Sequence, residues 1–316
     1  MRQRILTAAV GCSALFFASV VDSAGQQVAA VDMTVLGAFP GVQFTSPVAI
    51  NNRGDVVGSI WPTDSPGGIT AFIWTRKEGF QIIAPGAIAW DINDRGDVAG
   101  TYYPCNGCGP AGFIWSEHTG FSSLGSVLPL AINNRGDVAG QCGDLFVACA
   151  IVRGRLIEWP CNLDGCFTEA RAINDSGDVV VLRDSDNFGS DLTVYSRRGE
   201  PTFLGENAVG NDINNRGVVV GYSSANLPQL WTATSEAVAP PVTFFGALQA
   251  VNARGIAVGY SLNNEAIAWD ATTNVLTILR AEDPWAAGQD VNDRGDILGT
   301  ATVNGAVQMV LWRVRP

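Results

Sequence analysis

The sequence predicts an all-β protein, a seven-bladed β-propeller with four antiparallel strands per blade, and three observations lead to this prediction. A segment of about ten residues, typified by Ala49–Gly58, occurs seven times. The copies are spaced 42, 40, 41, 40, 38 and 40 residues apart. Between them lie β-branched and aromatic runs with turn signals and no useful helical period, which is the pattern of a propeller. An open β-solenoid is the alternative, but its repeats are usually shorter. The aligned asparagines are Asn51, Asn93, Asn133, Asn174, Asn214, Asn252 and Asn292.

The first residues are typical of an export signal. Arg2 and Arg4 precede an apolar run over residues 5–21, and small residues follow it. A basic start, an apolar stretch and a small-residue end characterise a secretory signal peptide. We expect residues 1–24 to be this signal and the mature protein to be secreted or periplasmic. An uncleaved anchor is the alternative, although no basic stop-transfer flank follows the run.

The first repeat shows how one blade is built. Strand a ends at Asn51, and Asn51–Gly54 forms a tight turn in which glycine supplies the positive φ after a type I turn. Strand b is expected at Asp55–Ile60. A variable loop then leads to strand c at Thr70–Trp74, and strand d follows at Phe80–Ala84.

The two ends of the chain are expected to complete one blade together. The last repeat has strands a to c within residues 287–313 and then stops without a strand d. Before the first repeat, Val31–Gly37 resembles the d strands of other repeats. We therefore expect Met33–Gly37 to pair with Gln308–Trp312, because closure removes two sheet edges. Residues 25–316 then form one propeller domain, expected to be a monomer.

Six cysteines of the mature chain fall into three local pairs. An even number, short spacings and an exported chain favour three disulfides. A redox role for the Cys-x-x-Cys segment lacks the helix N-terminus that lowers a thiol pKa. A zinc site built from the first two pairs is a further alternative. The expected pairs are Cys105 with Cys108, Cys142 with Cys149, and Cys161 with Cys166.

Composition and motifs narrow the function classes. A net charge of −11 argues against nucleic-acid binding. His118 is the only histidine, and no Gly-x-Ser-x-Gly segment accompanies it, so a nucleophilic triad has no support. Residues 91–97 resemble half of a calcium loop, but Arg95 occupies a ligand position, so we expect a turn and no metal. No cofactor is expected, and no membrane span after the signal.

The repeated pattern Ile-Asn-x-x-Gly-x-Val-x-Gly, followed by Ala-Phe-Ile-Trp, resembles the bacterial extracellular HAF-repeat family, named after a His-Ala-Phe triplet. Residues Thr70–Trp74 and Ala111–Trp115 carry the match, which extends over nearly all of the mature chain. The histidine of the triplet is absent from every copy, so any role for it is lost here. The resemblance implies an exported repeat protein and no established catalytic activity.

The b–c and d–a connections share one face of the predicted propeller and carry aromatic and acidic residues. Aromatic faces stack on the CH groups of sugars, and carboxylates accept hydrogen bonds from their hydroxyls. We therefore expect a non-catalytic binding or scaffold protein whose ligand is a glycan or an extracellular protein. Alternatively, half of these rings cap the core. The candidate ligand-binding residues are Trp61, Tyr102, Tyr103, Asp184, Asp186, Tyr222, Tyr260, Glu282, Asp283 and Trp285.

Two further functions are left open. A glycan-cleaving enzyme, a hydrolase or a lyase, would use two carboxylates on this face, about 5 Å apart for retaining and about 6.5–9.5 Å apart for inverting hydrolysis. Its candidates are Asp184, Asp186, Glu282 and Asp283, and the sequence selects no pair among them. A purely structural repeat would tolerate loss of Trp61 and Trp285 without any change in binding.

Overall fold

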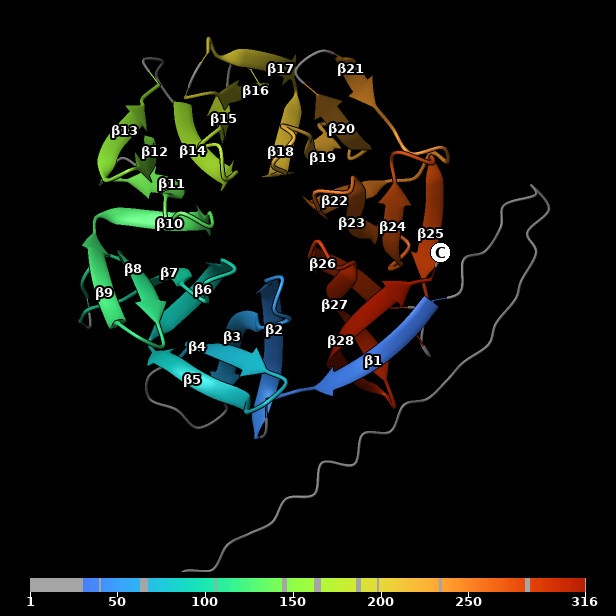
Figure 1. Cartoon of the computed structure of the whole chain (residues 1–316), viewed down its shortest axis with the longest axis horizontal. Coiled ribbons are helices and arrows are strands. Elements are labelled where there is room, and N and C mark those ends of the chain that lie inside the picture. Colours follow the sequence, from blue (N-terminus) through green and yellow to red (C-terminus); the bar gives the residue numbers. More distant parts are fainter. Residues whose placement is uncertain are drawn as a thin grey trace, which may run out of the picture.

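The computed structural model describes residues 31–39, 41–62, 68–105, 107–143, 147–161, 166–185, 189–197, 199–232, 235–281 and 285–315. The expected signal at residues 1–24 lies outside these ranges. Seven four-stranded antiparallel sheets are arranged in a ring (Figure 1). The described residues contain no helix. The prediction of a seven-bladed β-propeller is confirmed.

Each blade has four strands, named a to d from the channel outward. Strand a of blades 1 to 7 is β2 (Val42–Ile50), β6 (Ala87–Ile92), β10 (Val127–Ile132), β14 (Cys166–Ile173), β18 (Ala208–Ile213), β22 (Gly246–Val251) and β26 (Ala286–Val291). Strand b is β3 (Val56–Pro62), β7 (Val98–Tyr102), β11 (Val138–Cys142), β15 (Val179–Ser185), β19 (Val219–Ser223), β23 (Ile256–Ser261) and β27 (Asp296–Val303).

The two outer strands complete the blades. Strand c is β4 (Thr70–Thr75), β8 (Ala111–Ser116), β12 (Val147–Val152), β16 (Gly189–Tyr195), β20 (Pro228–Thr232), β24 (Ala266–Asp270) and β28 (Ala306–Val314). Strand d is β5 (Gly79–Pro85), β9 (Gly120–Gly125), β13 (Arg155–Trp159), β17 (Thr202–Glu206), β21 (Ser235–Val238), β25 (Val275–Leu279) and, in blade 7, β1 (Val31–Gly37).

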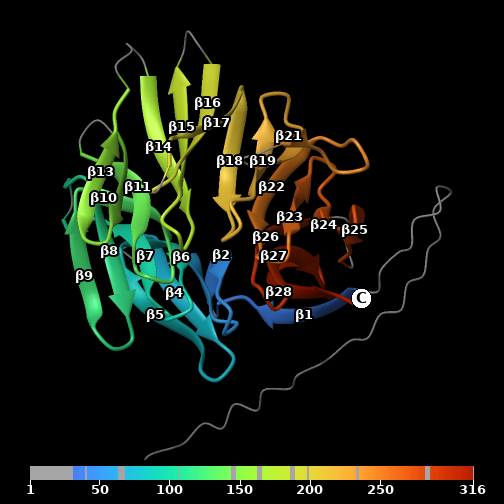
Figure 2. The same ribbon diagram turned by 45° about the horizontal axis from the view of Figure 1, so that its top comes forward.

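The N-terminal strand closes the last blade as predicted. β1 lies along β28 at the rim of the ring (Figures 1 and 2). The pairing is antiparallel and places Met33 opposite Trp312 and Gly37 opposite Met309. Pairing continues beyond the expected range to Val31 and Val314. Because the first and last strands share one sheet, the chain ends hold the ring shut.

Every inner strand contains a β-bulge three residues before the repeated asparagine, where the register with strand b shifts. In blade 2 the shift lies between Ala89 and Asp91. Strand a approaches strand b so closely there that a Cβ on Gly100 would lie 2.2 Å from the Ile88 oxygen. This explains why the second glycine of the repeat recurs. Blade 4 has Val181 at this position.

The core lies between neighbouring blades. Phe113 of blade 2, for example, packs with Ala49, Val57 and Ala71 of blade 1. Such burial of apolar side chains across each blade interface stabilises the ring. The ring has two faces. The turn face carries the a–b and c–d turns, and the loop face carries the b–c and d–a connections.

Candidate functional site

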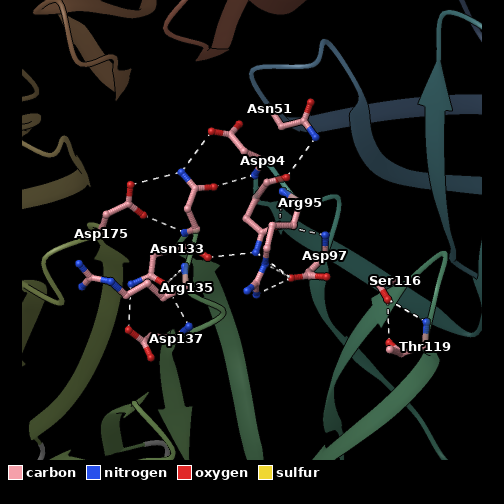
Figure 3. Close-up of polar contacts among 12 residues, drawn as sticks. Asn51, Asp94, Arg95, Asp97, Ser116, Thr119, Asn133, Arg135, Asp137 and Asp175 are labelled. Carbon is pink, nitrogen blue, oxygen red and sulfur yellow. Dashed lines mark hydrogen bonds and ion pairs between the residues drawn. The ribbon is translucent and has the colours of Figure 1, made fainter.

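The repeated asparagine organises the turn face. In blade 3, Asn133 accepts hydrogen bonds at Oδ1 from the main-chain nitrogens of Arg135 (2.9 Å) and Asp137 (3.0 Å). Its Nδ2 donates to Asp137 Oδ2 at 3.1 Å (Figure 3). The same Nδ2 donates to the carbonyl oxygen of Asn174, in blade 4, at 2.9 Å. Gly136 closes the turn with a φ of 83° and donates its N–H to the Asn133 carbonyl. One side chain therefore fixes its own turn and joins the next blade.

The same interblade bond recurs around the ring. Each asparagine Nδ2 donates to the carbonyl oxygen of the corresponding asparagine in the next blade, at 2.9–3.2 Å. Asn292 donates to Asn51 at 3.0 Å, so the circle closes. All seven side chains are buried, and their polar atoms are paired. The asparagine of the repeat is therefore a structural element of the ring.

A second ring lies beside the first and is built by the residue after each asparagine. Asn52 donates its N–H to Asp94 Oδ1 at 2.8 Å. Asp94 in turn donates its N–H to Asn134 Oδ1 at 2.7 Å (Figure 3). Asn and Asp alternate around the ring, so amide groups meet carboxylates. The alternation fails in blade 6, where Ala253 has no side-chain acceptor for the N–H of blade 5. The members are Asn52, Asp94, Asn134, Asp175, Asn215, Ala253 and Asp293.

Three half-buried carboxylates line the central channel close to these rings. They belong to Asp91, Asp212 and Asp290, and they border a cavity of about 180 Å³ around the axis. Each accepts one main-chain N–H from its own blade and one from the next blade around the ring. Asp91, for example, accepts from Ile92 at 2.7 Å and from Ile132 at 2.8 Å. The carboxylates thus bridge neighbouring blades, as the asparagines do.

The channel raises the pKa of all three carboxyl groups. Removal from bulk water is the main cause, and the main-chain N–H donors oppose it. The pKa of Asp91 rises to about 7, that of Asp212 to about 6 and that of Asp290 to about 8. Asp290 is highest partly because Asp212 and Asp91 repel its charge. Within the described ranges, no group of three or more His, Cys, Asp or Glu side chains is placed to hold a metal ion.

Sequence reasoning did not identify these three aspartates. The position two residues before the repeated asparagine is alanine in four copies and aspartate in three. The presence of aspartate in only three copies could have pointed to this site. The sequence alone does not show that the three side chains lie together, because only closure of the ring brings Asp91, Asp212 and Asp290 around one cavity.

The predicted ligand-binding residues divide into exposed and packed groups. Trp61, Tyr103 and Trp285 lie at the ends of strands or in connections of the loop face, with exposed fractions of 42, 55 and 37%. Tyr222 and Tyr260 are half-buried near the loop ends of β19 and β23. The exposed group is available for contact with a ligand.

Tyr102 belongs to the packed group. Its ring meets Phe121 edge-on with the ring centroids 4.8 Å apart, and its hydroxyl donates to Ser123 Oγ at 3.1 Å. The Phe113 ring stacks on the Phe121 ring, with the ring centroids 4.9 Å apart. Tyr102 thus caps the core of blade 2, as the alternative interpretation expected for part of the set.

The predicted carboxylates yield no pair within the described ranges. Asp184 is half-buried on β15 and accepts a hydrogen bond from Ser190 Oγ at 3.0 Å. Asp186, Glu282 and Asp283 lie outside the described residues. A catalytic spacing between two of these carboxylates therefore stays an expectation.

Three disulfides join the predicted cysteine pairs. Cys105 bonds to Cys108, Cys142 to Cys149, and Cys161 to Cys166, with Cα separations of 5.2, 5.8 and 6.0 Å. The prediction is confirmed. All three lie at the loop face of blades 2, 3 and 4, so this sector is covalently reinforced. Such bonds indicate an oxidising, extracytoplasmic compartment. Among the described residues, no helix is long and apolar enough to cross a membrane.

No protein-family model matches this chain, and no curated protein matches it. Solved structures do. Acylaminoacyl peptidase of Pyrococcus horikoshii has a TM-score of 0.60 at 12% identity, covering 88% of this chain and 52% of the peptidase. One of two prolyl endopeptidases has a TM-score of 0.57 at 9% identity, covering 89% and 51%. YCF48 bound to a D1 peptide has a TM-score of 0.50 at 10% identity, covering 90% and 95%.

The sheet topology shows that the chain is a seven-bladed propeller. It spans about half of the length of the two peptidases that it matches. At identities of 9–12% the propeller is similar to these proteins in fold alone.

Proposed function

We propose that this protein is a secreted, non-catalytic binding or scaffold propeller that holds a glycan or an extracellular protein on its loop face. The placement of exposed apolar side chains carries the proposal. Among the described residues, large exposed apolar side chains in a connection, or in the first or last two residues of a strand, include none at an a–b turn. On the turn face they lie at the starts of d strands: Phe121, Leu156, Phe203 and Val275. The loop face has more of them, including the exposed tryptophans and tyrosine: Trp61, Tyr103, Phe167, Val238, Val242, Phe245, Leu262, Ile278, Trp285 and Val307.

The turn face supports the proposal by contrast. Its amide and carboxylate groups are engaged with neighbouring blades, so a ligand there would have to break existing hydrogen bonds. Exposed aromatic and apolar groups on the loop face are hydrated instead, and contact with a ligand would release that water. Tyrosine and tryptophan are also the residues that most often dominate binding interfaces.

The secreted state rests on three features. Residues 1–24 have the pattern of a signal peptide, the three disulfides favour an oxidising compartment, and the repeat resembles the extracellular HAF-repeat family. The ring is closed by its own N-terminal strand, which is compatible with a monomer.

An array experiment tests the proposal. The mature chain, residues 25–316, is applied to arrays of glycans and of extracellular proteins, and each hit is repeated with a combined Trp61→Ser, Tyr103→Ser and Trp285→Ser variant. We expect this variant to lose binding, while the matched outer-strand variant Ile82→Ser, also 55% exposed at the wild-type residue, retains it.

Three results would contradict the proposal. Equal binding by wild type and the loop-face variant would place the ligand elsewhere. Absence of any hit would favour a purely structural repeat. Release of shortened sugars from a bound glycan would favour the glycan-cleaving alternative, in which carboxylates of the loop face act as acid and nucleophile or base.

A further inference from the structure

We infer a second binding site, a pocket for one neutral pyranose ring, between blades 3 and 4. The pocket has a volume of about 270 Å³. It contains none of the predicted ligand-binding residues, so it does not depend on the function proposed for the loop face. Its lining comes from the end of β13 in blade 3 and from β14, β15 and β16 in blade 4.

The pocket lies where blade 4 differs from blades 1 and 2. In blade 1, Gly58 lies opposite Phe72, and in blade 2, Gly100 lies opposite Phe113. The phenylalanine fills the space that the glycine leaves; a Cβ on Gly58 would lie 2.9 Å from the Phe72 ring.

Blade 4 has Val181 and Thr193 at the corresponding two positions. Both line the pocket. Threonine is much smaller than phenylalanine, so the interface between blades 3 and 4 is left with a space that Phe113 fills between blades 1 and 2.

The lining of the pocket changes from apolar side chains at its inner part to charged side chains at its loop end. Cross-strand pairs along one face of β15 and β16 are Val179 with Tyr195, then Val181 with Thr193, then Arg183 with Asp191 at the loop end. Blade 3 contributes the indole of Trp159, which meets the Tyr195 ring with centroids 5.1 Å apart. The inner part is therefore an aromatic and aliphatic floor.

Charged groups lie at the loop end of the pocket. The guanidinium of Arg183 forms an ion pair with Asp191, and the two side chains are 50 and 20% exposed. Glu158 adds an exposed carboxylate from blade 3. Donors and acceptors thus stand side by side over an apolar floor.

A pyranose fits this combination best. Its axial CH groups stack on aromatic faces, and adjacent hydroxyls both donate to a carboxylate and accept from a guanidinium. The volume lies just below the range of about 300–1,000 Å³ typical of drug-sized ligands, so one ring is the appropriate size. A quaternary ammonium ion also prefers aromatic rings, but it has no atom that could accept a hydrogen bond from the Arg183 guanidinium.

The rim of the pocket is held in place. Thr168 donates its hydroxyl to the Trp159 carbonyl at 2.8 Å and accepts the Ala148 N–H at 2.8 Å. The disulfide between Cys161 and Cys166 closes the connection that joins Trp159 to Thr168. A rim fixed in this way loses little conformational entropy when a ligand binds.

Titration followed by NMR tests the inference. The protein has nine tryptophans, and the indole N–H signal of Trp159 is assigned by its loss in Trp159→Phe. The full mature chain is titrated with methyl glycosides of glucose, mannose and galactose. We expect a saturable shift of the Trp159 signal with at least one of them, with a Kd of about 1 mM.

Two variants should remove this response. Asp191→Asn, which loses a charge-assisted hydrogen bond, should raise Kd about tenfold or more. The double variant Val181→Gly/Thr193→Phe restores the pairing of blades 1 and 2 and should abolish binding by filling the pocket. Thermal melts of both variants check that the ring still folds.

Matched controls keep the result specific. Asp296→Asn removes a carboxylate from the ion pair with Arg313 in blade 7, where side-chain exposures are 58 and 18%, and should leave Kd unchanged. Trp61→Ser should also leave it unchanged, which separates this site from the loop-face proposal. The inference is overturned by no saturable shift with any glycoside, by unchanged binding in the filled variant, or by a shift with tetramethylammonium alone.

Discussion

The two faces of the ring differ in how closely the seven repeats resemble one another. On the turn face the copies agree, and agreement lets each asparagine donate to the next until Asn292 reaches Asn51. On the loop face the copies differ in length, in disulfides and in exposed aromatic residues. Positions that are the same in all repeats therefore belong to the hydrogen bonds that close the ring. Positions that differ between repeats lie on the face that we propose binds a ligand.

The comparison has a physical basis. A hydrogen-bonded circle requires the same group at the same height in every blade, because a blade that lacks it leaves a buried donor or acceptor of its neighbour unpaired. The connections of the loop face do not have to supply a hydrogen-bonding group to the next blade. They can change in one blade without a cost in the next.

Removing one asparagine should have the largest effect. Asn133→Ala leaves the N–H groups of Arg135 and Asp137 and the carbonyl of Asn174 without their partner. We expect a loss of about 4 kcal/mol of unfolding free energy, measured by urea denaturation. Asn134→Ala, in the exposed second ring, is the matched control and should cost about 1 kcal/mol. Similar losses in both would show that the buried circle does not dominate the turn face.

The second-largest effect is expected from alkaline pH, which should lower the free energy of unfolding through the three aspartates at the turn-face end of the channel. A raised pKa means that the folded carboxyl holds its proton more tightly than the unfolded one, so its contribution to stability is full below about pH 4. It is lost as pH rises through about 6, 7 and 8, the pKa values of Asp212, Asp91 and Asp290. We expect the free energy of unfolding to be lower at pH 9 than at pH 5, because the three carboxyl groups then ionise inside the folded channel.

Urea midpoints across this pH range measure the effect. The combined variant Asp91→Ala, Asp212→Ala and Asp290→Ala has the residue that the other four blades carry, and should show a flatter pH profile. A profile identical to that of the wild type would mean that the three carboxylates titrate alike in the folded and unfolded chain.

The fold was predictable because it depends on features that repeat. A period near 40 residues, the Asn-x-x-Gly turn with its positive-φ glycine, and a last repeat without strand d together specified seven blades and the pairing of Met33 with the C-terminal strand. The cysteine pairs were predictable because each is closed by a short local connection.

The sites were less predictable because they depend on contacts between repeats. Asp91 and Asp290 meet only through closure of the ring. The pocket at Trp159 requires that Thr193 stand where Phe113 stands in blade 2, a cross-blade difference in volume that no motif records. The sequence predicts Tyr102 as a ligand contact, whereas in the structure its hydroxyl and ring contact Ser123 and Phe121 inside blade 2.

Loss of a loop-face disulfide should have a smaller effect that stays on that face. Cys142→Ser/Cys149→Ser opens a short hairpin between β11 and β12, and we expect a loss of about 2 kcal/mol from the greater entropy of the unfolded chain. Hydrogen exchange should rise in blade 3 at its loop end while the N–H of Asp137 stays protected. Exchange that rises equally on the turn face would contradict the separation of the two faces.

Completing the second ring should have the smallest effect, and it is the one expected gain. Ala253 interrupts the alternation, so the N–H of Asn215 lacks the side-chain acceptor that the other members of the ring have. Ala253→Asn supplies an Oδ1 for that N–H and an Nδ2 that faces Asp293. The site is exposed, so we expect a gain of only about 0.5 kcal/mol, read as a slightly higher urea midpoint. Ala253→Asp supplies the same acceptor but sets a second carboxylate beside Asp293, and should give no gain. If both variants stabilised the protein equally, charge alternation would not be what orders this ring.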